Sequence, residues 1–308
     1  MTSATDSRPP LIKGLRQLES CPLCEATKSR LLYDFDLIRV HKCLGCALFY
    51  LNPCLDAGSM AAVYEDDAHL LELNDFYKGY HEYGDIEGNS QTLREIHRCL
   101  ESMERYLPPD SGKTLLEIGA GNCLFLAAAQ KRGWEVAGIE SSSENVALAA
   151  KKYSISLRHG LFEQSEWKKE SFYAVVMMDV LEHRYDPKEF LSRVVPLIKP
   201  GGMLLITVPN HDSMLRYVSQ GLYWLSGSLL STGLRKVYLL EHTAYYNYQT
   251  MHALLSKQGI EIVQTFQSST DLNKYDLSKT QKLLAKIILT LGRWAKLENR
   301  LIVLGLKK

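Results

Sequence analysis

Several features are missing from this sequence, and each absence excludes a class of protein. The 308 residues contain no uninterrupted apolar run near the ~20 residues that a membrane-spanning helix needs. Residues 1–10 are polar, include two prolines and lack the apolar core of a signal peptide. The net charge is only +1, so no global field draws the chain to nucleic acid. We therefore expect a cytoplasmic protein, and a large RNA is not the expected substrate.

The seven cysteines are odd in number, which does not suit a fully disulfide-bonded secreted protein. Four of them form two Cys-x2-Cys pairs with eighteen residues between the pairs: Cys21, Cys24, Cys43 and Cys46. Two tight turns that each present two sulfurs to one metal are typical of a four-thiolate zinc site. We expect Leu31–Val40 to form a hairpin between the pairs, and residues 1–55 to be a zinc ribbon with an N-terminal arm. Because this segment has little apolar content, structural zinc would stabilise it. A finger that binds nucleic acid or protein and a group of four reduced core cysteines are the alternatives.

A glycine turn between two expected strands is the centre of the chain. Leu115, Leu116 and Ile118 form a short apolar run that predicts a buried strand, and glycines end it. Gly119 and Gly121 let backbone approach a ligand closely. A helix over Leu124–Arg132 follows, and the next strand ends at Glu140. Close backbone approach together with a carboxylate for ribose hydroxyls is typical of a nucleoside pocket.

Two cofactor classes compete for such a pocket. A dinucleotide site of the form G-x-G-x-x-G would need a third glycine where this chain has Leu124. The run Glu117-Ile-Gly-Ala-Gly resembles instead the first motif of class I S-adenosylmethionine-dependent methyltransferases. Cys123 stands where that family's fuller G-x-G-x-G form has its last glycine. A nicotinamide cofactor and a turn with no ligand stay open as alternatives.

A second motif extends the resemblance across residues 114–266. Asp179-Val-Leu-Glu-His183 with Asp186-Pro187 matches the D-V-L-E-H-x-x-D-P signature of the ubiquinone and sugar O-methyltransferase-like branch. A zinc ribbon ahead of such a domain recurs in bacterial methyltransferases of polysaccharide and natural-product pathways. The resemblance implies a methyl transfer from S-adenosylmethionine, with O-methylation of a small-molecule, sugar or lipid-linked acceptor. An RNA methyltransferase that uses the ribbon as a clamp and a non-catalytic binding module are the rival hypotheses.

From residue 112 the pattern alternates between strand and helix, which predicts an α/β, Rossmann-like parallel sheet with helices on both faces. The expected strands are 114–119, 135–140, 155–159, 174–178, 203–208, 260–266 and 300–305, and the last is antiparallel by resemblance. The expected helices are 91–107, 124–132, 144–152, 188–198 and 249–257. We divide the chain into the ribbon (1–55), a helical linker or lid (56–110) and a methyltransferase domain (111–308) with insertions at 211–240 and 271–298. Tyr80 or Tyr83 is the candidate lid residue.

The carboxyl ends of the strands supply the candidate site residues, because open α/β sheets bind ligands there. The cofactor residues predicted from the motifs are Glu117, Gly119, Ala120, Gly121, Glu140, Phe162, Met178 and Asp179. In the family an acid often follows the glycine at the end of the third strand, whereas this chain has Leu161. Removal of a proton from a hydroxyl acceptor needs a base, and His183 and His242 are the candidates. A structural role is the alternative for each histidine.

One insertion carries an amphipathic helix over Asp276–Leu297. Its expected apolar face is Leu283, Leu284, Ile287, Ile288, Leu291 and Trp294, and lysines and arginines line the other face. Packing in the core or in a dimer explains this pattern, and so does a helix that lies on a membrane surface.

Overall fold

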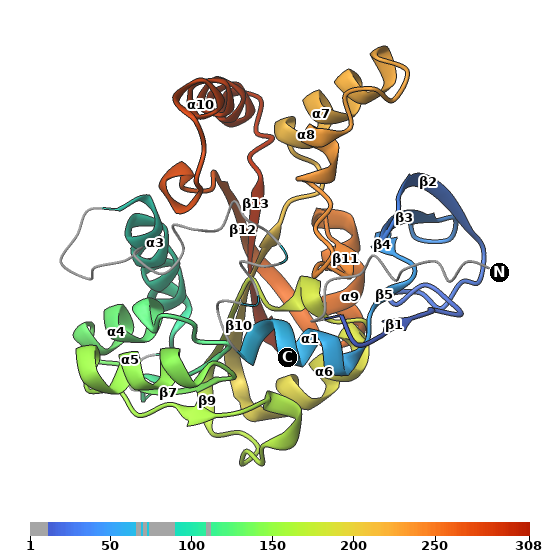
Figure 1. Cartoon of the computed structure of the whole chain (residues 1–308). Coiled ribbons are helices and arrows are strands. Elements are labelled where there is room, and N and C mark those ends of the chain that lie inside the picture. The colour runs from blue at the N-terminus through green and yellow to red at the C-terminus, as the bar shows by residue number, and fades with distance from the viewer. Residues whose placement is uncertain (1–11, 66–68, 70–72, 74–89, 109–111) are drawn as a thin grey trace.

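The computed structural model describes residues 12–65, 69, 73, 90–108 and 112–308, and Figure 1 shows how their elements are arranged. A seven-stranded sheet forms the centre, in the order β12-β13-β10-β9-β6-β7-β8. Its strands are β6 Thr114–Ile118, β7 Glu135–Glu140, β8 Arg158–His159, β9 Phe172–Met178, β10 Ile198–Pro209, β12 Ile260–Ser268 and β13 Arg300–Lys307. β13 is antiparallel to both of its neighbours, as the resemblance implied. The predicted Rossmann-like, seven-stranded sheet is therefore confirmed.

Successive side chains along each central strand point to opposite faces of the sheet, and both faces are buried. Leu116 and Val175 contribute to one buried cluster, whereas their neighbours Leu115 and Ala174 contribute to the cluster on the opposite face. The second face is covered by α3 Gln91–Tyr106, α4 Leu124–Lys131 and α5 Ser143–Tyr153, and the first by α6 Pro187–Val194 and α9 Tyr248–Lys257. Helices thus lie on both faces, and the carboxyl ends of the parallel strands stay open at one edge.

Several expected boundaries differ from the structure, among them the start of β10, which begins at Ile198 and not at residue 203. The helix expected over 188–198 ends at Val194, and a single tighter turn continues to Leu197 before β10 begins at Ile198. Pro196 explains the change, because it has no N–H to donate to the helical carbonyl one turn earlier. The third strand is also shorter than expected and contains only Arg158 and His159.

The cysteine pairs lie in a second sheet of four strands, β2 Ser29–Phe35, β3 Ile38–Cys43, β4 Phe49–Leu51 and β11 Ala244–Tyr245. The hairpin expected over Leu31–Val40 is present as β2 and β3. β11 comes from a distant part of the chain and pairs antiparallel with β4. A short ladder between β1 Leu15–Arg16 and β5 Cys54–Leu55 closes this part, and α1 Ala57–Glu65 follows it. The division at residues 55 and 110 stays a prediction, and the lid candidates Tyr80 and Tyr83 lie outside the described residues.

The insertions form α7 Met214–Leu225, α8 Thr232–Arg235 and α10 Lys279–Trp294. All three lie at the top of Figure 1, with α10 to the left of α7 and α8. α7 packs against both α8 and α10. Among the described residues, no helix is both long and apolar enough to cross a membrane.

Candidate active site

A cavity lies at the carboxyl ends of β6 and β9, where the sheet leaves its edge open. The glycine turn and the end of β9 line one part of it, and α3 and the start of β13 line the rest. Its lining residues are Thr92, Glu95, Ile96, Glu117, Gly119, Ala120, Gly121, Asn122, Leu124, Phe125, Met178, Asp179 and Arg300. The structure therefore brings Glu117, Gly119–Gly121, Met178 and Asp179 together on one wall, which is the grouping that the motifs predict.

The two glycines of the turn have different physical reasons to be glycine. Both have positive φ angles, +71° at Gly119 and +51° at Gly121, which side chains rarely adopt. A Cβ at Gly119 would lie 2.8 Å from Cγ2 of Val180, so packing also forbids a side chain there. A Cβ at Gly121 would meet no atom of the described residues within 4 Å. Gly121 therefore leaves room in the cavity, whereas Gly119 lets the turn pack on the loop after β9.

Two carboxylates at the cavity each keep a buried oxygen with no hydrogen-bond partner in the described part of the chain: Oε2 of Glu117 and Oδ1 of Asp179. Burial raises the pKa of Glu117 well above its usual range, and the nearby charge of Glu140 adds to the shift. Asp179 sits directly after β9 with φ +57°, so the chain leaves the strand direction at this residue. A buried acceptor without a hydrogen-bond partner lowers the stability of the fold. A ligand that brings N–H donors or positive charge would supply the missing partner.

Arg300 is a cavity residue that sequence reasoning did not select. Its Nη1 donates to Oδ2 of Asp179 at 2.8 Å, and its Nε donates to Oε1 of Glu95 at 3.3 Å. The guanidinium thereby joins α3, β9 and β13 at the cavity wall, and the two carboxylates hold its pKa well above the usual range despite burial. The signal that could have found it was its position: a lone cation at the start of an antiparallel strand lies at the same sheet edge as the ends of the parallel strands.

The other two predicted cofactor residues lie outside the residues that line the cavity. Oε2 of Glu140 accepts from the Gly121 N–H at 2.7 Å, and its Oε1 accepts from the Ser142 N–H at 2.9 Å. These two hydrogen bonds hold Glu140 against the glycine turn. Each carboxylate oxygen has a second lone pair that could accept another hydrogen bond. Phe162 is buried and packs edge-to-face on Phe190 with ring centroids 5.5 Å apart. In this structure Phe162 is a core residue.

The two candidate bases meet in space although they are far apart in the sequence. The rings of His183 and His242 pack edge-to-face with centroids 4.8 Å apart. Nδ1 of His183 lies 2.9 Å from the Glu241 carbonyl oxygen, to which it donates, and the Tyr64 hydroxyl contacts the same ring. Burial lowers the pKa of His183 to about 4 and that of His242 well below its usual range. Both imidazoles are therefore neutral at neutral pH and keep a basic nitrogen.

Glu182 completes this buried group. Neither of its carboxylate oxygens has a hydrogen-bond partner among the described residues, and the same holds for Nδ1 of His242. Burial raises the pKa of Glu182 well above its usual range, and the charge of Asp179 adds to the shift. Ligand atoms of Glu182, His183 and His242 all lie within 4.8 Å of one another, a spacing at which they could also hold a cation. The loop from Asp179 to His183 connects this group to the cavity.

The four cysteines of the two pairs converge as expected. Sγ of Cys21 lies 3.6 Å from Sγ of Cys46, and Sγ of Cys24 lies 3.5 Å from Sγ of Cys43. A tetrahedral zinc with ~2.3 Å bonds places its sulfurs about 3.8 Å apart, so the observed spacing fits a metal of that size. All four are free thiols. The donor set and its geometry are those of a site that could hold zinc.

Comparison with known proteins adds to this geometry. The family described as "Methyltransferase domain" matches residues 91–265, which is more than half of the chain and includes most of the cavity wall. The chain belongs to this methyltransferase family. The ubiquinone biosynthesis O-methyltransferase of Paracidovorax citrulli is 28% identical over 149 residues, which are 46% of this chain and 63% of that protein. The enzyme of the same name from Caulobacter vibrioides is 34% identical over 109 residues, 33% of this chain and 43% of that protein. The chain thus spans less than two thirds of the length of these relatives.

Solved methyltransferases share the fold at low sequence identity. The phosphoethanolamine N-methyltransferase 2 of Haemonchus contortus in complex with S-adenosyl-L-methionine aligns at a TM-score of 0.51 and 18% identity, over 77% of this chain and 59% of that chain. A Galdieria sulphuraria protein described as a sarcosine dimethylglycine methyltransferase aligns at 0.54 and 13% identity, over 79% and 99% of the two chains. These likenesses establish the methyltransferase fold.

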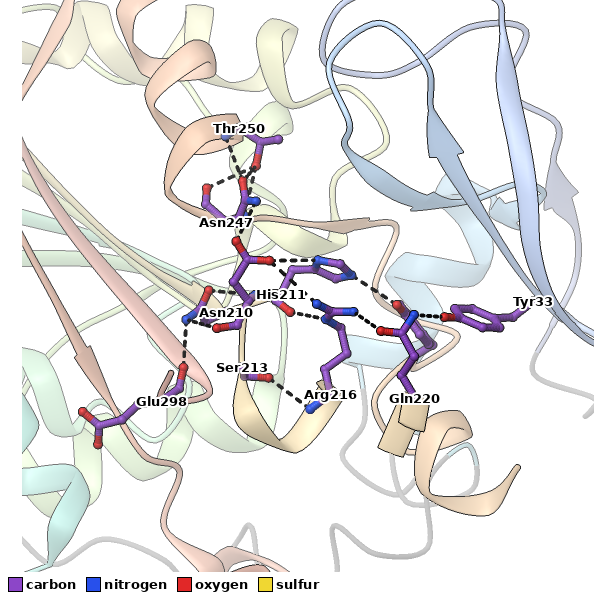
Figure 2. Close-up of polar contacts among 11 residues, drawn as sticks. Tyr33, Asn210, His211, Ser213, Arg216, Gln220, Asn247, Thr250 and Glu298 are labelled. Atoms are coloured by element: carbon purple, nitrogen blue, oxygen red, sulfur yellow. Dashed lines mark hydrogen bonds and ion pairs between the residues drawn. The ribbon is translucent and has the colours of Figure 1, made fainter. Parts of the chain in front are cut away.

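A buried polar network joins the methyltransferase sheet to the four-cysteine part of the chain (Figure 2). Nε2 of His211 lies 3.1 Å from the Tyr238 hydroxyl, and Nε of Arg216 donates to the His211 carbonyl. Nη1 of Arg216 donates to Oε1 of Gln220 at 2.8 Å, and Nε2 of Gln220 donates to the hydroxyl of Tyr33 on β2. The network therefore fixes α7 between the end of β10 and the hairpin.

Proposed function

We propose that this chain transfers a methyl group from S-adenosylmethionine to an oxygen of a small-molecule, sugar or lipid-linked acceptor. The observation that carries the proposal is the cavity at the carboxyl edge, with its glycine turn and the two orphaned carboxylate oxygens of Glu117 and Asp179. S-adenosylmethionine carries an ammonium and a sulfonium, so acceptors without partners suit it better than a filled apolar pocket would. The O-methyltransferase names of the curated relatives support oxygen as the acceptor atom.

The residues present fit such a cofactor. Gly121 leaves open space at the turn, and Glu117 and Asp179 would accept hydrogen bonds from its cationic amino-acid end. Glu140, held behind the turn by two backbone N–H groups, is the candidate for the ribose hydroxyls. The cofactor supplies an activated methyl group when bound. Arg300 bonds both Asp179 and Glu95 and keeps the two carboxylates in place at the cavity wall.

Calorimetric titration of the purified chain with S-adenosylmethionine tests the proposal. We expect binding in the micromolar range, with S-adenosylhomocysteine competing for the same site. No binding at high micromolar concentration would remove the enzyme hypothesis and would favour the non-catalytic binding module. Product mass shifts in cell extract supplied with isotope-labelled cofactor would then identify the acceptor.

His183 and His242 are the proposed bases for a hydroxyl acceptor. Burial lowers the pKa of each, so both are neutral at neutral pH and keep a lone pair, while the lowered pKa makes each a weaker base than an exposed imidazole. His183→Gln and His242→Gln should lower turnover and leave affinity for the cofactor unchanged. His252→Gln is the matched control, because His252 is exposed on α9. Unchanged turnover in both test variants would remove the base hypothesis.

The four cysteines are proposed to hold one structural zinc. Cys21 and Cys43 belong to the same buried cluster as Val175 on the central sheet, which favours a stabilising role over an exposed clamp for RNA. A cytoplasmic location, where thiols stay reduced, suits such ligands. Elemental analysis should give one zinc per chain, and Cys43→Ser should lose it together with thermal stability. A metal-free wild-type chain of normal stability would contradict this assignment.

A further inference from the structure

Two helical insertions expose large apolar side chains on one side of the molecule. Trp224, Leu225 and Leu229 lie at the end of α7 and in the turn that follows it, and Leu225 is 89% exposed. Leu283, Leu284 and Trp294 lie on α10, and Trp294 is 82% exposed. We call these six residues the apolar ridge. Several large exposed apolar side chains on two helices that pack against each other mark an interaction site more often than a scattered single leucine does.

The way α10 packs explains why the ridge is left in water. α10 contacts α7 through its narrow side, where Gly292 lies against Met214 and Leu289 is buried. The broad apolar face expected from the sequence is largely exposed. A small contact with α7 thus holds α10 in place. The larger apolar face of α10 is not covered by the described part of the chain.

The helical segments that carry the ridge contain basic residues and no acidic ones, and three of their arginines, Arg216, Arg235 and Arg293, pair with Asp212, Asp36 and Glu298 outside these segments. Residues 214–240 and 279–297 together contain eight lysines or arginines and no aspartate or glutamate, although the whole chain is nearly balanced at 36 basic and 35 acidic residues. Lys279, Lys282 and Lys286 lie on α10, and none of them forms an ion pair with a carboxylate among the described residues. A surface that combines exposed tryptophan and leucine with unopposed lysines complements an anionic, apolar partner.

A second copy of this chain fits the ridge poorly. A two-fold dimer would place the same patch on both subunits, so each cationic surface would face another. A lipid bilayer with anionic headgroups satisfies both features: the headgroups meet the lysines, and the acyl boundary accepts Trp294 and Leu225. We propose that the apolar ridge and the lysines of α10 dock this protein on an anionic membrane surface.

The two insertions that carry the ridge join the sheet at the edge that holds the cavity. α7 begins shortly after β10 ends, and α10 is followed by β13, whose first residue Arg300 lines the cavity. The Asn210 N–H donates to the Asn299 carbonyl oxygen at 2.9 Å, which ties the two insertions together at that edge. Docking would therefore bring the cavity close to the bilayer, and, on the basis of the proposed function, would favour the lipid-linked class of acceptor.

Vesicle flotation tests the proposal with the full chain. Vesicles of phosphatidylcholine alone are compared with equimolar phosphatidylcholine and phosphatidylglycerol, at low and high salt. We expect binding to the anionic vesicles that decreases with salt, because headgroup attraction is screened. Lys279→Gln/Lys282→Gln/Lys286→Gln should weaken this binding about a hundredfold, at about fivefold for each charge. Leu225→Ser/Trp294→Ser should weaken it about tenfold or more at either salt concentration.

Matched controls separate the ridge from general surface effects. Lys168→Gln/Lys169→Gln removes exposed lysines elsewhere, and Leu44→Ser removes an exposed leucine from the four-cysteine part; both should bind vesicles as the wild type does. Equal thermal stability and equal affinity for S-adenosylmethionine in all variants would show that fold and cavity are intact. Absence of wild-type binding to anionic vesicles, or equal binding by ridge and control variants, would overturn the proposal. So would concentration-dependent dimerisation that the ridge variants abolish without any vesicle binding. Each of these outcomes leaves the proposed methyl transfer to be judged by calorimetry alone.

Discussion

Cys123 offers a sharp test of the glycine turn, because its backbone is left-handed and its side chain is buried. Its φ is +64°, and it precedes α4 as the N-cap residue. A side chain with a Cβ costs about 1 kcal/mol or more in this region relative to glycine. The Sγ is fully buried, so its removal costs about 1 kcal/mol of transfer and packing free energy. Cys123→Ala loses the sulfur and keeps the strain, whereas Cys123→Gly loses both.

The difference between these two variants isolates the backbone conformation. At an ordinary helical position alanine is more stable than glycine by about 1 kcal/mol. At Cys123 we expect the opposite sign, with Cys123→Gly more stable than Cys123→Ala by about 1 kcal/mol. Urea unfolding of both variants measures this difference, and the midpoint temperature of thermal unfolding should differ by about 1.5 °C for a chain of 308 residues. Calorimetry should show that Cys123→Gly keeps or improves the affinity for S-adenosylmethionine. A glycine variant that is less stable than the alanine variant would refute the left-handed assignment, and a large loss of affinity would mean that the turn has been misinterpreted.

Three further predictions follow from the cavity and its surroundings. Gly121→Ala places a methyl in open space at φ +51°, so it should cost about 1 kcal/mol of stability and lower cofactor affinity at least tenfold by calorimetry; unchanged affinity would place the cofactor elsewhere. Glu182→Gln should become more stable than the wild type as pH rises above about 4.5, by up to about 1.4 kcal/mol per pH unit, because burial raises the pKa of Glu182 and the folded chain holds a proton that the unfolded chain releases. Urea unfolding between pH 5 and 8 measures this slope, and a stability difference independent of pH would contradict it. Arg300→Met should destabilise the fold by about 3 kcal/mol, because it leaves Asp179 and Glu95 without their shared cation, and Asp179→Asn in the same chain should recover part of the loss; no recovery would show that the ion pair is not the cause.

The strand and helix pattern of the central sheet could be predicted because it depends on local periodicity. Leu115 and Leu116 bury opposite faces of the sheet, so the first strand shows in the sequence as an apolar run followed by glycines. The two Cys-x2-Cys pairs indicate a metal site in the same way, since each pair is a single local turn. The helix end at Val194 was missed although its cause, Pro196, stands in the sequence. Boundaries of this kind depend on one residue rather than on a repeating pattern.

The candidate site was predictable only where a motif is continuous in sequence. Gly119–Gly121 and Met178–Asp179 lie on one cavity because both follow parallel strands that are neighbours in the sheet. Phe162 was expected at the ligand because it follows the third strand, but the structure packs it on Phe190. Whether the residues on the cavity wall bind the cofactor stays a prediction that calorimetry can test.

The sequence by itself determined the sheet, the glycine turn and the two Cys-x2-Cys turns, because periodicity and short spacing act over a few residues. Only the tertiary structure decided the contacts between distant segments. It placed Arg300 between Glu95 and Asp179, brought His183 to His242 and paired β11 with β4 of the four-cysteine part. It also turned the apolar face of α10 outward, although the sequence pattern of that helix is equally typical of a buried one. An amphipathic pattern specifies that one face avoids water, and which surface covers that face is set by the packing of the rest of the chain.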